Sequence, residues 1–325
     1  MRTWSLWCAA ACAVAVLTGC QSVAGARAST APDTPAGEAA VQQAQPDDLT
    51  PREQRDWRAY LVRFPSPCPQ AGHSIAECLA DDRSCAACRP AAEFVTASIR
   101  AGHPAEQVEA RYMARFDPAR VRLVPLEGAP SMGPADAVVT VVEFADFECP
   151  FCAAAVPLID KLVRAYAPHV RVAFRNYPIK YHEHADLAAR AAMAAHAQGK
   201  FWQMHHELFG NRTALERADI ERYARSANLD LTRFMRDLDS PEVAQAVRND
   251  YQTGSQLGVS GTPTFFINGR EFNISLFDFG GEDLLSWIEL EIRLATGKPF
   301  GAEGAEVLQQ AAPISRAAVR HSYQR

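Results

Sequence analysis

The stretch Val138-Val-Thr-Val-Val-Glu-Phe-Ala-Asp-Phe-Glu-Cys-Pro-Phe-Cys152 decides the fold of this chain. Its first eight residues are mostly apolar and rich in β-branched side chains, and they are bounded by Asp146, which predicts a buried strand. Beyond Cys152, apolar side chains recur at helical spacing, at Val156, Ile159 and Val163. The sequence therefore predicts that Cys149 and Cys152 lie where a strand passes into a helix.

A Cys-x-x-Cys pair at such a junction has a specific chemical consequence. Its first sulfur lies at the helix N-terminus, where unpaired backbone amides and the positive end of the helix dipole favour the thiolate. A second thiol one turn further on can resolve a mixed disulfide formed by the first, as disulfide exchange requires. A structural disulfide and half of a zinc site are the alternatives, and the strand-to-helix context favours exchange.

Three further features accompany the cysteine pair. Pro157 lies within the predicted helix, where it removes a backbone hydrogen bond and is expected to kink the helix. The segment Gly258-Val-Ser-Gly-Thr-Pro-Thr-Phe-Phe-Ile-Asn-Gly269 predicts a strand that begins at a proline and is closed by an Asn-Gly turn. Glu143 lies inside the first strand, six residues before Cys149.

In combination these motifs resemble the thioredoxin superfamily, and especially its DsbA-like branch of bacterial extracytoplasmic proteins that carry Asp-Phe-x-Cys-Pro-Phe-Cys. The resemblance covers residues 135–297 and implies an α/β thioredoxin fold with a helical insertion. It also implies thiol-disulfide oxidoreductase activity. We expect residues 170–175 to form the second strand, residues 185–255 the helical insertion, and residues 284–294 the closing helix.

The resemblance also assigns catalytic roles to individual residues. Cys149, exposed in a loop, would be the nucleophile, and the shielded Cys152 would be the resolving thiol. Glu143 would be the buried acid beneath the active site that shuttles a proton for Cys152, and desolvation would raise the pKa of its carboxyl group. The alternative for Glu143 is a position at a frayed strand end that reaches solvent.

Substrate contacts are expected at the loop before the distal strand and between the two cysteines. A cis Thr262–Pro263 bond would lie against the sulfurs and expose the backbone of Thr262 to an extended peptide. A trans proline that merely starts a strand is the alternative. Phe151 occupies a position where DsbA itself has a histidine, so we expect a milder oxidant than DsbA. The direction of physiological electron flow stays open.

The N-terminus predicts the compartment. Within residues 1–19, Arg2 begins a short basic region and Trp4 to Leu17 form an apolar run too short to span a bilayer, which is typical of a signal peptide. The run ends in Leu17-Thr18-Gly19-Cys20, which resembles the lipobox of bacterial lipoproteins and implies a diacylglycerol on Cys20. Because Gln21 follows rather than aspartate, we expect anchoring to the outer membrane, facing the periplasm. A cleaved signal with an incidental cysteine is the alternative.

Composition divides the rest of the chain into segments. Residues 20–50 lack aromatic side chains and are rich in Ala, Pro, Gln, Ser and Thr, so they predict a flexible tether. Residues 51–118 predict a small helical module, residues 119–134 a linker, and residues 298–325 a loosely packed tail.

Four cysteines characterise the small module: Cys68, Cys78, Cys85 and Cys88. In an oxidising compartment such a set most often forms two structural disulfides, which a thin core needs. A zinc site and a second redox-active pair formed by Cys85 and Cys88 are the alternatives.

The composition restricts the partners. With 33 basic and 38 acidic residues and a formal net charge of -5, the chain gives no reason to expect nucleic acid. Five histidines between 182 and 206 lack convincing carboxylate partners at ligand spacing, so we expect solvated or core histidines, no metal and no cofactor. The expected partners are cysteine-containing polypeptides and a membrane or periplasmic redox partner.

Two functions agree with these features. The first is a periplasmic, membrane-tethered oxidoreductase that forms, reduces or exchanges disulfides in polypeptides. The second is a specialised lipoprotein whose four-cysteine module docks one client, for example an apocytochrome, for reduction. A redox-competent Cys85/Cys88 pair would favour the second. No segment resembles the dimerisation domain of the disulfide isomerases, so we expect a monomer.

Overall fold

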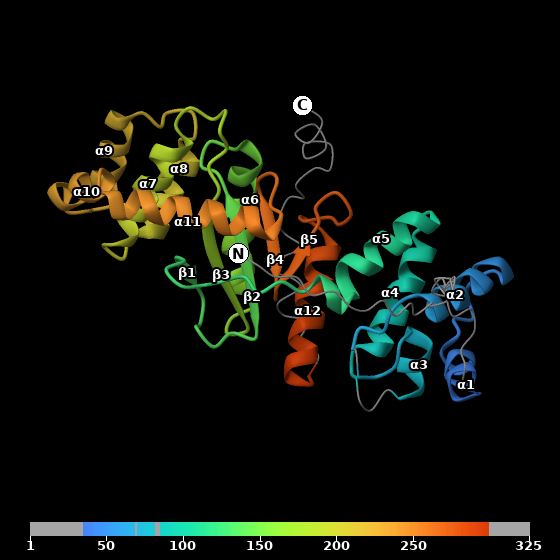
Figure 1. Ribbon diagram of the computed structural model, residues 1–325. Coiled ribbons are helices and arrows are strands. Elements are labelled where there is room, and N and C mark those ends of the chain that lie inside the picture. The colour runs from blue at the N-terminus through green and yellow to red at the C-terminus, as the bar shows by residue number, and fades with distance from the viewer. Residues whose placement is uncertain (1–34, 69, 82–84, 299–325) are drawn as a thin grey trace, which may run out of the picture. The chain divides into compact units, whose positions relative to one another are not determined.

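The structure, a computed structural model, describes residues 35–68, 70–81 and 85–298 (Figure 1). The predicted signal peptide, the lipid-bearing Cys20 and the tail beyond residue 298 lie outside these residues. In the part of the chain that is described, no helix combines the length and the apolar character that crossing a membrane requires.

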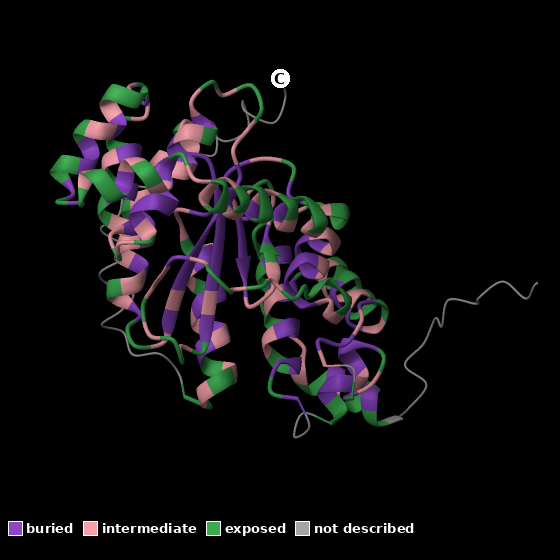
Figure 2. Ribbon diagram, turned by 60° about the vertical axis from the view of Figure 1, so that its left-hand side comes forward, coloured by how far each residue is buried: buried purple, intermediate pink, exposed green. Residues whose placement is uncertain are grey.

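A five-stranded mixed sheet lies at the centre of the larger domain. Its strands are β1 (Ser131–Met132), β2 (Val139–Ala145), β3 (Val170–Asn176), β4 (Thr264–Ile267) and β5 (Arg270–Phe272). They are ordered β1-β3-β2-β4-β5, and only β2 and β3 run parallel. The central strands are buried along most of their length (Figure 2), which explains why β2 and β3 are almost continuously apolar.

Helix α6 (Pro150–Ala165) connects the two parallel strands and covers one face of the sheet. Its apolar stripe packs with α12 (Glu282–Thr296) against every second residue of β2, including Val139 and Val141. Because side chains alternate along a strand, Glu143 points to the same face as Val141, toward α6. The nucleophile's helix and the buried carboxylate therefore share one side of the sheet.

The opposite face packs against a different part of the chain. Val142, Phe144 and Phe266 meet side chains from α11 (Pro241–Leu257) there. This helix ends the predicted insertion, which comprises α7 (Ala185–His196), α8 (Phe201–Gly210), α9 (Arg217–Ser226), α10 (Leu231–Leu238) and α11. The expected α/β thioredoxin fold with inserted helices is confirmed.

The C-terminal hairpin follows its sequence signal. Asn268 and Gly269 both have positive φ, 47° and 79°, which a two-residue turn between twisted strands requires. The turn joins β4 to β5, and the pairing of the two strands ends at Phe272.

Helices form the N-terminal module. They are α1 (Pro35–Ala44), α2 (Pro51–Arg63), α3 (Ile75–Ala80), α4 (Cys88–Arg100) and α5 (Ala105–Phe116), followed by the short 3₁₀ turn η1 (Pro118–Arg120). Reciprocal capping boxes start α2 and α3, with Thr50 paired to Glu53 and Ser74 to Glu77. The core contains the fully buried Trp57, whose indole N–H donates to Thr96 Oγ1 at 2.9 Å.

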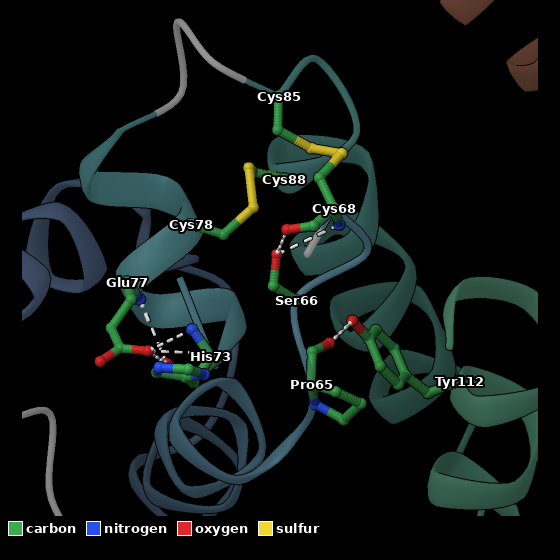
Figure 3. The surroundings of a disulfide bond; sticks show 10 residues. Pro65, Ser66, Cys68, His73, Glu77, Cys78, Cys85, Cys88 and Tyr112 are labelled. Atoms are coloured by element: carbon green, nitrogen blue, oxygen red, sulfur yellow. Dashed lines mark hydrogen bonds between the residues drawn. A yellow bond between two sulfur atoms is a disulfide. The ribbon is translucent and has the colours of Figure 1, made fainter. Parts of the chain in front are cut away.

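Two disulfides hold the module together, Cys68–Cys85 and Cys78–Cys88 (Figure 3). The sulfurs of Cys78, Cys85 and Cys88 lie within 4.8 Å of one another, so the two bridges are neighbours. Sulfurs joined in a disulfide are not available as the thiolate ligands that a zinc site needs. Cys85 and Cys88 are bonded to Cys68 and Cys78 and not to each other. The pairing thus matches neither the zinc site nor the Cys85/Cys88 redox pair.

The tether predicted for residues 20–50 differs from the structure in its second half. Residues 35–44 form α1, and Val41 and Leu49 are buried with the module core. Arg100 also makes two hydrogen bonds to the carboxylate of Asp48, at 2.6 and 2.7 Å. Composition alone did not predict the order of this segment. A few apolar side chains are enough to hold it in place because α3 supplies a surface on which they pack.

The linker predicted for residues 119–134 is also partly structural. Ser131 and Met132 pair with β3 as the edge strand β1, and Arg122 N donates to Gly269 O at 2.7 Å. The thioredoxin domain therefore begins before residue 135. Two residues are too short a run for sequence periodicity to reveal.

Candidate active site

Cys149 lies at the junction where the sequence predicts it. It is the N-cap of α6, and its N–H donates to Asp146 O at 3.1 Å while its carbonyl accepts from Ala153 N at 3.2 Å. Pro150 follows at the first helical position, where a missing amide hydrogen costs nothing. Cys149 is only 5% exposed, which corrects the expectation of a loop-exposed thiol. Its burial comes from the loops that close around the sulfur.

The surroundings of the Cys149 sulfur favour its ionised form. Hydrogen bonds from the Cys152 thiol, from the Thr262 side chain and from the backbone amides of Cys152 and Phe151 lower the pKa of Cys149 to about 6. Burial opposes this shift, and the donors outweigh it. In the thiol form, Cys149 Sγ donates to the carbonyl oxygen of Thr262 at 3.4 Å. A thiolate with a pKa near 6 is largely ionised at neutral pH.

The surroundings of Cys152 favour its protonated thiol, in contrast to those of Cys149. It is fully buried on the inner side of α6. Desolvation first, and then the neighbouring Cys149 and Glu143, raise the pKa of its thiol well above the ordinary value. Both cysteines are present as free thiols rather than as a disulfide. The pair therefore combines one ionised and one protonated sulfur, separated by one turn of helix.

Glu143 lies beneath this pair in the middle of the sheet. It pairs in register with Phe174 of β3 and Phe265 of β4, and it is only 2% exposed. Burial among these strands, together with the charge of Cys149, raises the pKa of its carboxyl group to about 8. The solvent-reaching alternative for Glu143 does not match this position.

The loop before β4 forms the wall opposite the cysteines. Thr262 and Pro263 are joined by a cis peptide bond and are both buried. The hydroxyl of Thr264 donates to Gly261 O at 2.8 Å, which fixes the backbone just before the cis bond.

These loops enclose a groove of about 450 Å³. One wall consists of Cys149, Pro150 and Phe151, and another of Ser260, Gly261 and Thr262. The remaining lining comes from Tyr177, Ile179, Lys180, Tyr181, His182 and Tyr251. The structure thus brings together Cys149, Phe151 and Thr262, which were predicted separately from distant segments.

Asp146 connects the active-site loop to the wall formed by Ile179 and His182. The sequence identified this residue only as the end of a strand. Its buried carboxylate accepts hydrogen bonds from Glu148 N at 2.7 Å and Ile179 N at 2.6 Å. It also pairs with His182 Nδ1 at 2.9 Å. His182 therefore has a carboxylate partner that is distant in the sequence. The sequence carries no signal for this contact, because 36 residues separate the two side chains.

Comparison with known proteins is consistent with this geometry. Residues 126–285 match a protein-family model described as "Thioredoxin". Among curated proteins, the chain is 45% identical over 139 residues to the Na(+)/H(+) antiporter NhaA 3 of Salinispora tropica. It is 42% identical over 138 residues to the antiporter NhaA of Herminiimonas arsenicoxydans. These matches cover 42% of this chain but only 21% and 22% of the antiporters, so the chain spans about a fifth of their length.

Solved structures that resemble this chain include two of related description. A thioredoxin-like oxidoreductase from Silicibacter pomeroyi is 37% identical, with a TM-score of 0.41 over 44% of this chain and 82% of that one. Oxidised BdbD from Bacillus subtilis is 24% identical, with a TM-score of 0.48 over 53% of this chain and 97% of that one.

Proposed function

We propose that residues 126–285, which match the Thioredoxin family model, form a thiol-disulfide oxidoreductase domain of the DsbA-like kind, and that the protein exchanges disulfides in extracytoplasmic polypeptides through Cys149 and Cys152. The observation that carries the proposal is the position of Cys149. Its sulfur lies at a helix N-terminus, faces the Thr262 carbonyl, and lines a groove open to an extended chain.

In the proposed reaction the Cys149 thiolate attacks one sulfur of a substrate disulfide. The Cys149–substrate bond forms, the substrate S–S bond breaks, and the second substrate sulfur leaves as a thiolate that takes up a proton. Cys152 then loses its proton and attacks the Cys149 sulfur. The Cys149–Cys152 bond forms, the Cys149–substrate bond breaks, and the first substrate sulfur leaves as a thiolate that takes up a proton. The products are a Cys149–Cys152 disulfide and a reduced substrate. The reverse sequence oxidises a substrate dithiol.

Glu143 serves the second step in this proposal. The Cys152 thiol has a strongly raised pKa and is fully buried, so it needs a neighbouring group to take its proton. A carboxyl group with a pKa of about 8, electrostatically coupled to both cysteines, can accept that proton near neutral pH. Glu143 acts as a proton shuttle for the resolving thiol.

The substrate binds in the groove between Cys149 and Thr262. An extended peptide can pair with the backbone beside Thr262 as an added strand, while Phe151 packs against its side chains. Such backbone pairing is tolerant of sequence, which suits an enzyme with more than one client.

Replacing Cys152 with serine tests the exchange reaction directly. The variant should accumulate mixed disulfides between Cys149 and substrate, because attack proceeds and resolution cannot. Replacing Cys149 with serine should prevent these adducts. If neither purified protein nor cell extract yields adducts with Cys152→Ser, Cys149 is not the nucleophile of an exchange enzyme.

The reduction potential of the Cys149/Cys152 couple, measured against glutathione, tests whether the protein mainly oxidises or reduces its substrates. A lowered thiol pKa stabilises the reduced form and makes a couple more oxidising. A pKa of about 6 for Cys149 lies between the thioredoxin and DsbA values of roughly 7 and 3.5. We therefore expect a potential between those of the two proteins.

The proposed site of action is the periplasm, with the protein anchored through a lipid on Cys20. The lipobox-like Leu17-Thr18-Gly19-Cys20 supports the anchor, and disulfide chemistry suits an oxidising compartment. Growth with labelled fatty acid should mark the wild type, and Cys20→Ala should release unlabelled protein into the soluble periplasm. An unlabelled, soluble wild type would contradict the anchor while leaving the exchange activity untouched.

A further inference from the structure

The third wall of the active-site groove carries charge and an exposed aromatic ring that the exchange reaction does not use. Its residues Lys180, Tyr181 and His182, here called the basic rim, follow β3 and precede α7. Tyr181 is 83% exposed, although its ring is large and partly apolar.

The basic rim is held in place rather than free to move away. Asp146 binds Ile179 N and His182 Nδ1 on either side of the rim. Glu148 Oε2 accepts from His184 N at 2.8 Å, just beyond it. Both carboxylates belong to the active-site loop, so the rim is fixed relative to the Cys149 sulfur. The Tyr181 ring is further positioned by an edge contact with the His182 ring at 4.9 Å.

The permanent charge that lines the groove is positive only. Lys180 is the only groove-lining residue with a permanent charge, and it makes no ion pair with any residue that the structure describes. No aspartate or glutamate lines the groove. Glu183 is exposed nearby but outside the lining, and Asp146 is buried and already occupied by three hydrogen bonds.

We propose that the basic rim selects substrate polypeptides that carry an aspartate or glutamate two residues from the reacting cysteine. This inference rests on the proposed function and names the substrate class of the same groove. An extended peptide advances about 3.3 Å per residue, so a side chain two positions from the cysteine lies on the same face of the peptide at roughly 7 Å. Lys180, whose ammonium group offers three donors, attracts its carboxylate.

The Cys149 thiolate acts against this preference. Before exchange it is negative and by itself favours a basic peptide, so a preference for acidic peptides that disappears in Lys180→Gln must come from the rim. The charge of the thiolate disappears once the mixed disulfide forms, which leaves the rim as the lasting charge in the groove. Because the thiolate and the basic rim favour peptides of opposite charge, the charge of the preferred peptide shows which of the two dominates.

The test uses reduced full-length protein and three blocked peptides. Each peptide carries one cysteine as a mixed disulfide with mercaptoethanol and has glutamate, glutamine or lysine two residues away on both sides. Single-turnover rates with wild type should follow glutamate above glutamine above lysine, with about fivefold between the first two, the usual size of an exposed charge pair. The order should weaken in 1 M salt, where screening is strong.

Charge reversal provides the matched comparison. Lys180→Glu should invert the ratio of glutamate- to lysine-peptide rates, and Lys180→Gln should bring it close to one. Lys161→Glu, the same change on α6 outside the groove, should keep the wild-type ratio. Equal ratios in all four proteins, or a faster lysine peptide with wild type, would overturn the selectivity while leaving exchange established. Failure of every peptide with wild type would instead refute the proposed function.

Discussion

The sulfur of Cys149 lies 3.4 Å from the carbonyl oxygen of Thr262, although 113 residues separate the two in the chain. The contact joins the start of α6 to the loop before β4. It also encloses the sulfur so that Cys149 is both buried and supplied with hydrogen-bond donors. Reactivity in this site therefore depends on two segments that only the folded domain brings together.

Alkylation of the reduced protein should detect the lowered pKa of Cys149. A thiolate stabilised by the donors around it should be half ionised near pH 6, whereas a free cysteine has a pKa near 8.5. The labelling rate of Cys149 with iodoacetamide, followed by peptide mapping, should rise with a midpoint near pH 6. Cys152 should stay unlabelled over this range because its thiol is buried and protonated. Earlier labelling of Cys152 would reverse the assigned roles.

Replacing Glu143 with glutamine should stabilise the protein at alkaline pH. The folded-state pKa of Glu143 is about 8 against an ordinary 4.5, so the native state binds more protons than the unfolded state between these values. The contribution of Glu143 to wild-type stability should therefore fall as pH rises from 5 to 8, at up to about 1.4 kcal/mol per pH unit. Urea denaturation of Glu143→Gln should show a flatter profile and greater stability at pH 8.

The same variant should also slow catalysis at one step. Glutamine cannot take the proton of Cys152, so mixed disulfides should persist longer while their formation rate is unchanged. Quenched-flow separation of the two steps distinguishes this result from a general loss of activity. If resolution is as fast in Glu143→Gln as in wild type, the carboxyl group is not the proton acceptor.

Replacing His205 with phenylalanine should stabilise the domain, most strongly in acid. Both ring nitrogens of His205 are buried and have no hydrogen-bond partner among the described residues. Burial lowers its pKa to about 3, so the unfolded state binds more protons below pH 6.5 and the buried His205 destabilises the native state increasingly as pH falls. Removing the unpaired groups from a cluster of aromatic rings should contribute about 1–3 kcal/mol. Urea titrations from pH 7 to pH 4 measure the effect.

His206 provides a neighbouring control with the opposite sign. It pairs with Asp160 at 2.9 Å, and the hydrogen bond to that carboxylate raises its pKa despite partial burial. Its contribution to stability is fully present in acid and lost as pH rises through its folded pKa. His206→Phe should therefore reduce stability at pH 5, whereas His205→Phe increases it.

Both disulfides of the module should resist glutathione. They join residues 17 and 10 positions apart, and restriction of the unfolded chain by loops of this length stabilises by about 2–3 kcal/mol each. Mass spectrometry after mild alkylation with glutathione present should find Cys68–Cys85 and Cys78–Cys88 intact and Cys149 labelled. A Cys85–Cys88 bond in equilibrium with the Cys149 couple would restore the redox alternative. Hydrogen exchange of α3 should accelerate in Cys78→Ala/Cys88→Ala.

The sequence predicted those parts of the molecule whose signals are local. The β-branched run of β2, the apolar periodicity of α6 and the Asn268-Gly269 turn each lie within one short segment, and all three elements are present. Helix α1 was missed because its stability comes from burial of Val41 against the module, which no local pattern records. Contact between Asp146 and His182 was missed for the same reason, since packing of distant segments creates it.

Gly254 on α11 has a consequence for the breadth of the groove. A β-carbon there would lie 2.8 Å from the ring of Tyr177 and 3.0 Å from that of Phe144, closer than such atoms can approach. Tyr177 lines the groove, and its hydroxyl donates to Val259 O at 2.7 Å, next to the wall formed by residues 260–262. The absence of a side chain at Gly254 thus leaves room for the Tyr177 ring behind the groove, and a single methyl group at this position would displace that ring.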